Sequence, residues 1–257
     1  MVTRALALLT LAACSGKPRP EEATHAPVHD DATVLGDAGR AGSDAAARPA
    51  IGDLQIRVEW PDVPVAARSS PGRTPCHTPR MPSVVPTTTW GVPDALVIVE
   101  GAAPRTGDAH VTLENCTLLP RIAAGGTLAI TSAVDRSAKL VLRKRGAVAS
   151  LGTLAAGDPV PVMLPIAGHT VTTALDPGAI YSLETDAADP EVTFIAAVPS
   201  GYVTEASGQV IIRDLAIGTH AVTAWLPPRA GQPARTGRGT ATVTAGDLVE
   251  LTVTLQQ

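Results

Sequence analysis

Apolar and polar side chains alternate along several short segments of this chain. From Leu54 to Trp60, every second side chain is large and apolar, and the side chains between them are polar. Because successive side chains of a β-strand point to opposite faces, this spacing predicts a strand with one buried face. The run 95–99 is apolar throughout, which predicts a strand covered on both faces. Further strand-like segments are 111–113, 128–131, 140–142, 160–164, 179–183, 192–198, 210–212, 220–225, 240–244 and 249–255.

Glycine and proline separate the predicted strands. The chain contains 23 residues of each type, and turn sequences lie at 124–126, 176–178 and 245–247. Aromatic residues make up only 2% of the chain, so the core is expected to be mainly aliphatic. No convincing helical pattern is present. The sequence therefore predicts an all-β, sandwich-like protein, and 257 residues suffice for one or two domains with buried cores.

The N-terminus has the pattern of a short export signal. Arg4 supplies a positive charge, an apolar stretch covers 5–13, and Cys14 follows two alanines. The run 11–14 resembles the lipobox of bacterial lipoproteins, which implies that residues 1–13 are removed and that Cys14 is lipidated. An ordinary secretory signal followed by a chance cysteine is the alternative. Ser15 instead of Asp after the cysteine implies the outer membrane of a Gram-negative bacterium, by the sorting rule of enteric bacteria.

Residues 14–50 have the composition of a linker. They are rich in Pro, Ala, Asp, Gly and Glu and contain few branched apolar side chains. Such a segment buries too little surface to offset its chain entropy, so we expect a disordered tether between the lipid and the β-rich part. His25 and His29 are interpreted as solvated linker residues, with weak metal chelation as the alternative.

Two cysteines remain once Cys14 is assigned to lipidation. Cys76 and Cys116 form an even pair in an exported chain, which predicts a disulfide. The bridge would attach the long loop around Cys76 to the strand near Cys116. Two buried free thiols are the alternative.

The C-terminal part contains a recognisable succession of turns and strands. Thr204 precedes an acidic residue, Gly208 begins an apolar strand, and Gly218 begins another that ends in Ala-Trp at Trp225. This succession resembles the carboxypeptidase regulatory-like (transthyretin-type) repeat. His220 stands where that family usually has an aromatic residue.

The middle part, from Asn115 and Cys116 through Pro120 and Arg121 to Val198, resembles the cupredoxin-like domains that accompany such repeats. The two resemblances imply that the regions before and after this stretch are two halves of one transthyretin-like sandwich. The implied segments are 1–13, a lipoprotein signal peptide; 14–50, the lipidated cysteine and linker; 51–106, the first part of the transthyretin-like sandwich; 107–200, a degenerate cupredoxin-like domain; and 201–257, the carboxypeptidase regulatory-like C-terminal part.

The copper ligands of this family are missing. Cupredoxin-like copper sites combine two His, a Cys thiolate and often a weak axial Met. The resemblance places Lys139, Thr185, Ala188 and Glu191 at these positions, and the segment 170–200 contains no Cys or His. Lys is cationic, Thr lacks a thiolate and Ala lacks a donor. We therefore expect no copper, no electron transfer and no cofactor.

Charge is unevenly distributed along the chain. The net charge of −4 argues against a general nucleic-acid binder. Five basic residues nevertheless concentrate near the position of the lost copper site. We favour a solvated hairpin that protects a strand edge; the alternative is a patch that docks lipid A phosphate, an acidic polysaccharide or an acidic protein. The five residues are Arg136, Lys139, Arg143, Lys144 and Arg145.

The chain contains no Gly-x-Ser-x-Gly, no His-Glu-x-x-His and no phosphate-binding glycine loop. We therefore expect a non-catalytic binding or structural module of the cell envelope, held to the membrane by its N-terminal lipid. Its expected partner is an unidentified protein or glycan, and not a nucleic acid. The alternative is an envelope metal-binding protein with a rearranged site of His77, His110 and His169. An envelope hydrolase has no motif to support it.

Overall fold

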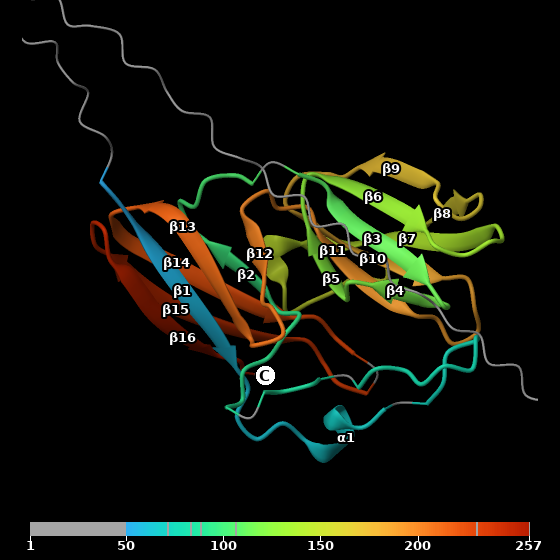
Figure 1. The fold of residues 1–257 in the computed structure, drawn as a ribbon, viewed down its shortest axis with the longest axis horizontal. Coiled ribbons are helices and arrows are strands. Elements are labelled where there is room, and N and C mark those ends of the chain that lie inside the picture. The colour runs from blue at the N-terminus through green and yellow to red at the C-terminus, as the bar shows by residue number, and fades with distance from the viewer. Residues whose placement is uncertain are drawn as a thin grey trace, which may run out of the picture. The chain divides into compact units, whose positions relative to one another are not determined.

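The computed structural model describes residues 50–70, 72–82, 84–87, 89–105, 107–229 and 231–256. The predicted signal peptide, the lipidation at Cys14 and the histidines His25 and His29 lie outside the described residues. Among the described residues strands predominate, and they form several sheets, so the fold is all-β as the sequence predicts (Figure 1). The short helix α1 (Val65–Arg68) is an exception that sequence analysis missed, because a single turn leaves no helical periodicity.

The first sandwich combines strands from both ends of the described region (Figure 1). β1 lies in the middle of a sheet of order β13-β1-β16, antiparallel to β13 and parallel to β16. The facing sheet has the order β12-β2-β14-β15. Strands that precede and follow the middle of the chain therefore share one core. The strands are β1 (Ile51–Glu59), β2 (Leu96–Val99), β12 (Gly201–Val203), β13 (Gln209–Ala216), β14 (Gly218–Leu226), β15 (Arg235–Val243) and β16 (Leu248–Thr254).

Alternation in β1 explains how this core forms. Leu54, Ile56 and Val58 are fully buried, while the residues between them are partly exposed. On β13, Ile212 and Leu215 are both buried although they are three residues apart. A register shift in the β1–β13 pairing brings the two side chains to the same face, since Leu215 pairs with Gly52 and Ile212 with Leu54.

The second sandwich is formed by the middle of the chain. One sheet has the order β4-β3-β6-β9 and the other the order β5-β11-β10-β7-β8. Its core includes Leu128, Ile130, Leu140, Leu183 and Ile195. The strands are β3 (Ala109–Glu114), β4 (Thr117–Leu119), β5 (Ile122–Ala124), β6 (Thr127–Ser132), β7 (Ala138–Ala147), β8 (Pro159–Leu164), β9 (Thr170–Ala174), β10 (Ala179–Thr185) and β11 (Val192–Ala196).

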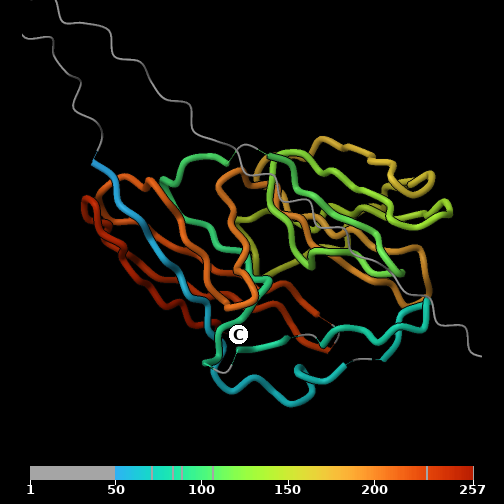
Figure 2. Tube along the Cα trace, in the orientation of Figure 1, coloured from blue at the N-terminus to red at the C-terminus, as the bar shows by residue number. Residues whose placement is uncertain are grey.

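The two sandwiches pack against each other through a third apolar cluster. Figure 2 shows the chain leaving the first sandwich after β2 and returning to it at β12. Leu96 joins this cluster, whereas Val97 faces the core of the first sandwich, so β2 is buried on both sides as its apolar run predicts. Trp225 is fully buried at the same interface, and its ring meets that of Phe194 edge to face, with centroids 5.7 Å apart.

Each predicted strand segment overlaps an observed strand, whereas β4, β5, β9 and β12 were not predicted. Three of these four strands contain only three residues, which is too short for alternation to be recognised. β9 is rich in threonine and none of its five residues is fully buried, so it lacks the apolar positions that reveal a strand.

Candidate functional site

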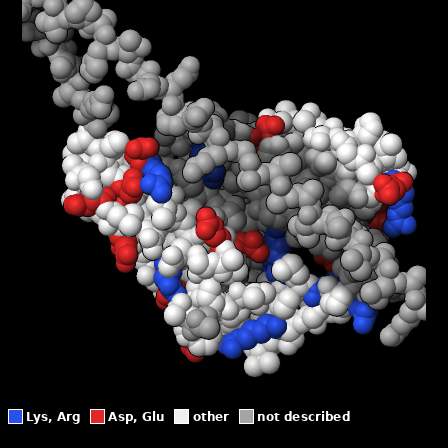
Figure 3. Space-filling view, in the orientation of Figure 1, with Lys and Arg blue, Asp and Glu red and all other residues white. Residues whose placement is uncertain are grey.

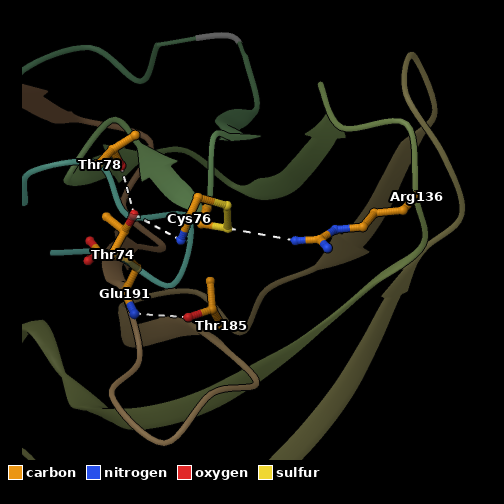
Figure 4. Close-up of a disulfide and its surroundings, with 7 residues drawn as sticks. Thr74, Cys76, Thr78, Arg136, Thr185 and Glu191 are labelled. Carbon is orange, nitrogen blue, oxygen red and sulfur yellow. Dashed lines mark hydrogen bonds between the residues drawn. A yellow bond between two sulfur atoms is a disulfide. The ribbon is translucent and has the colours of Figure 1, made fainter.

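Cys76 and Cys116 form a disulfide, with Cα atoms 5.8 Å apart (Figure 4). Cys76 lies in the loop between α1 and β2, and Cys116 lies in the turn between β3 and β4. The loop is further held by Thr74, whose hydroxyl accepts a hydrogen bond from the Cys76 amide at 3.2 Å and lies 2.7 Å from the Thr78 hydroxyl. The bridge therefore ties the long loop of the first sandwich to a hairpin of the second, as the sequence predicts.

The four positions that resemble copper-ligand sites lie close together in the second sandwich. Lys139 is on β7, Thr185 ends β10, and Ala188 and Glu191 follow in the loop that leads to β11. The Glu191 amide donates a hydrogen bond to the Thr185 hydroxyl at 2.9 Å (Figure 4). Lys139 Nζ lies 2.9 Å from a carboxylate oxygen of Asp186. The region is thus organised by hydrogen bonds and an ion pair, and its side chains include neither a thiolate nor an imidazole.

Arg80, from the disulfide-bridged loop, covers this region. Its Nε atom lies 3.1 Å from Glu191 Oε1, and its Nη2 atom lies 3.0 Å from Asp189 Oδ2. Its side chain is only 10% exposed. Among the four positions that the resemblance assigns to copper ligands, Glu191 has the one carboxylate, and the Arg80 guanidinium lies beside it and balances its charge.

The predicted basic cluster is largely neutralised by neighbouring carboxylates. It comprises Arg136, Lys139, Arg143, Lys144 and Arg145. Lys144 Nζ lies 2.8 Å from Asp176 Oδ2, and this hydrogen bond lowers the pKa of Asp176. Arg143 and Arg145 both contact Glu184, at 3.4 and 3.5 Å. Alternation along β7 directs Lys144 to the face opposite that of the other two. The five side chains therefore do not form a single unpaired patch, and Figure 3 shows acidic and basic groups interspersed over the visible face.

The described histidines do not form a metal cluster. Within residues 50–70, 72–82, 84–87, 89–105, 107–229 and 231–256, no group of three or more His, Cys, Asp or Glu could hold a metal ion. His77 lies in the disulfide-bridged loop, and His110 and His169 are exposed on the second sandwich. His220 is 8% exposed, and its ring nitrogens lie 2.8 and 2.7 Å from the carbonyl oxygens of Glu100 and Ala216. It connects β14 to its neighbours and has a structural role.

The structure reveals an arginine-lined cleft that sequence analysis missed. It consists of two hollows of about 250 and about 320 Å³, which share Met81, Arg121 and Arg229. Arg80 and Arg145 line the first hollow. The side chains come from the disulfide-bridged loop, from both sandwiches and from the loop that follows β14. We call this region the arginine cleft and define it by Arg80, Arg121, Arg145 and Arg229.

Arg229 has two buried side-chain nitrogens without a hydrogen-bond partner among the described residues, whereas Arg145 has one, its Nε. Arg229 Nη1 donates to the Arg121 carbonyl at 3.4 Å, whereas its Nε and Nη2 are the two buried nitrogens. Burial, followed by the charge of Arg121, lowers the pKa of Arg229 to about 9, while Asp94 and Glu191 raise it. The guanidinium therefore remains positive at neutral pH. Two buried, charged donors without an acceptor are well suited to an anion.

A common local feature links three of the cleft arginines. Arg80, Arg121 and Arg229 each directly follow a proline. Arg121 and Arg229 are 108 residues apart, so neither spacing nor periodicity connects them. The repeated Pro-Arg pair is the sequence signal shared by the three arginines, but it does not indicate that they lie close together in the fold.

Comparison with protein-family models, curated proteins and solved structures found no match. Among the described residues, no helix is long and apolar enough to cross a membrane. The residues of the arginine cleft are therefore the basis for assigning a function.

Proposed function

We propose that this chain is a lipid-anchored, non-catalytic binding module of the bacterial cell envelope that holds an anionic ligand in the arginine cleft. The observation that carries the proposal is the buried Arg229 guanidinium, whose Nε and Nη2 lack a hydrogen-bond partner in the part of the chain that the structure describes. An unpaired buried charge destabilises a fold, because desolvation is not repaid by hydrogen bonds. Its position at both hollows of a cleft supports ligand binding over a purely structural role.

The proposal includes a fold type: a degenerate cupredoxin-like sandwich inserted into a transthyretin-like sandwich. Support comes from the motifs at 115–198 and 204–225. The pairing of β1 with β13 and of β2 with β14, on either side of the middle domain, agrees with this arrangement. The copper-ligand positions have become the binding surface for Arg80, which supports a structural use of that region in place of electron transfer.

Anchoring through Cys14 places the module on the outer membrane in this proposal. Its support is the signal-like segment 1–13 and the alanine pair before the cysteine. Cells fed an alkyne analogue of palmitate should label the wild-type protein, and the variant Cys14→Ser should remain unlabelled and leave the membrane fraction. Equal labelling of the two proteins would refute lipidation at this residue.

Anion binding is tested by thermal unfolding of the full chain at constant ionic strength, with chloride replaced by acetate, phosphate or sulfate. At least one anion should raise the unfolding temperature, since a ligand that binds only the folded state stabilises it. The variant Arg229→Gln should lose this response, whereas Arg238→Gln, which alters an exposed arginine of β15, should keep it. If no anion stabilises the wild-type chain, the binding proposal is wrong.

The metal-binding alternative predicts a different outcome. It requires convergence of His77, His110 and His169, and no such group occurs among the described residues. Titration with Cu(II), Cu(I) and Zn(II), read by native mass spectrometry, should give no stoichiometric complex. A one-to-one complex that survives desalting would favour the alternative.

A further inference from the structure

The arginine cleft has a charge balance, a donor geometry and an apolar lining that together select one kind of anion. We propose that it binds a small organic monocarboxylate with a short aliphatic body, an inference that rests on the proposed anion-binding function.

The charge of the lining matches a monoanion. Four arginines define the cleft, and three carboxylates, those of Asp94, Glu191 and Glu205, also line its two hollows. Arg80 and Arg145 are also paired with Asp189 and Glu184, which lie outside the lining, so the charge with buried donors left over is that of the Arg229 guanidinium. A single carboxylate neutralises one guanidinium, whereas a dianionic phosphate group would overcompensate it and be repelled by the three carboxylates of the lining.

The two unpartnered donors have the geometry for a carboxylate. Nε and Nη2 lie on the same edge of the planar Arg229 guanidinium, so their N–H bonds point in nearly the same direction. This edge can donate two parallel hydrogen bonds to the two oxygens of one carboxylate. The third nitrogen, Nη1, is directed to the Arg121 carbonyl, which helps to fix the plane of the group.

The remaining lining is suited to an aliphatic body. Val192 and Phe194 line the first hollow, and Val84 and Leu226 line the second. Met81 lies in both hollows and is 52% exposed, so an apolar ligand group would remove part of its surface from water. Hollows of about 250 and 320 Å³ are at the lower end of the volumes in which proteins bind small molecules, which favours a short body over a long one.

The chemical class is tested on the full, unaltered chain by calorimetric titration with three matched probes: butyrate, butyramide and butyl phosphate. Butyrate should bind, and butyramide should bind at least about tenfold more weakly, because it cannot accept two charge-assisted hydrogen bonds. Butyl phosphate should also bind more weakly than butyrate. Tighter binding of butyl phosphate than of butyrate would overturn the monocarboxylate inference and leave anion binding in place. Equal binding of butyrate and butyramide would overturn both, because the cleft would then not distinguish an anion from a neutral amide. No response to any anion would remove both.

A free organic acid and the C-terminus of a peptide present the same carboxylate. An acetylated Ala-Ala-Val peptide with a free terminus, compared with its amide, separates these two sources. Tighter binding of the free peptide than of butyrate would identify a peptide terminus as the ligand and overturn the small-acid assignment. Weaker binding of the peptide supports the small acid.

Arg229 is tested by two substitutions with one control. Arg229→Gln should weaken butyrate binding about ten- to a hundredfold through loss of a charged, two-donor contact. Arg229→Lys keeps the charge and loses the parallel donors, so it should also weaken binding, and it remains informative if the Gln variant does not fold. Arg238→Gln should bind as the wild type does. Unchanged affinity in the Lys variant would show that charge alone suffices and would refute the bidentate contact.

Discussion

Removal of the Cys76–Cys116 disulfide should strongly destabilise the folded protein. The bridge closes a loop of sequence separation 40, which contains most of the segment between α1 and β2 and all of β2 and β3. Replacement of both cysteines with serine frees this loop in the unfolded chain and thereby raises the entropy of the unfolded state.

The chain-entropy relation gives the magnitude. For a closed loop of this length, the lost constraint corresponds to about 4 kcal/mol at 25 °C. In a domain of roughly 200 residues, each kcal/mol shifts the unfolding temperature by roughly 2–4 °C, so the double variant should melt roughly 8–16 °C lower. The same loop carries Arg80 and Met81, so butyrate binding should also weaken in this variant.

The assay is urea unfolding of the full chain, with and without a reducing agent. Reduction should shift the wild-type midpoint to that of the Cys76→Ser/Cys116→Ser variant and should leave the variant unchanged. If the variant lost less than about 1 kcal/mol, the bridge would not constrain the unfolded chain as the loop-closure relation requires, and the entropic reasoning would be refuted.

Three further predictions follow from the packing and the ion pairs. Trp225→Ala, at a fully buried position, should cost about 3–5 kcal/mol in chemical denaturation; a cost below about 1 kcal/mol would mean that the sandwich interface is not closely packed. Arg80→Gln should lower the free energy of unfolding by about 1–3 kcal/mol, because it leaves the Glu191 carboxylate without its cation. Lys139→Gln, which breaks a half-exposed ion pair, should lower it by at most about 1 kcal/mol. Equal losses in the two variants would contradict the importance of burial. The hydrogen bonds of Asp176 lower its pKa from 3.8, so its contribution to stability is present above pH 3.8 and is lost as the pH falls through the lowered pKa. Asp176→Asn should therefore flatten the acidic part of the profile of unfolding temperature against pH. An unchanged profile would show that Asp176 does not contribute to the acid sensitivity of the fold.

Several features of the fold follow from local patterns. The alternation in β1 and the unbroken apolar run of β2 indicate one-sided and two-sided burial, because side-chain orientation in a strand has a fixed period of two residues. The disulfide between Cys76 and Cys116 follows from the count of cysteines together with the prediction that the chain is exported. The lack of Cys and His at residues 170–200 is likewise read directly from the sequence, without knowledge of the fold.

Other features depend on which distant segments meet. The sequence shows the basic residues of β7 but not the carboxylates that neutralise them. The pairing of β7 with β10 brings Asp176 and Glu184 beside these basic residues. Within the first sandwich, the local pattern of β1 shows that one face is buried but does not identify β13 and β16 as its neighbours.

The division between sequence and structure is clearest at the arginine cleft. The sequence by itself determined most of the strands, the all-β class and the cysteine pair, because each depends on residue type or on short-range periodicity. Only the tertiary structure brought Arg121 and Arg229 together and left two Arg229 nitrogens buried without a hydrogen-bond partner among the described residues. The physical reason is that desolvation and hydrogen bonding depend on distances between atoms, and the packing of two sandwiches and a bridged loop sets those distances.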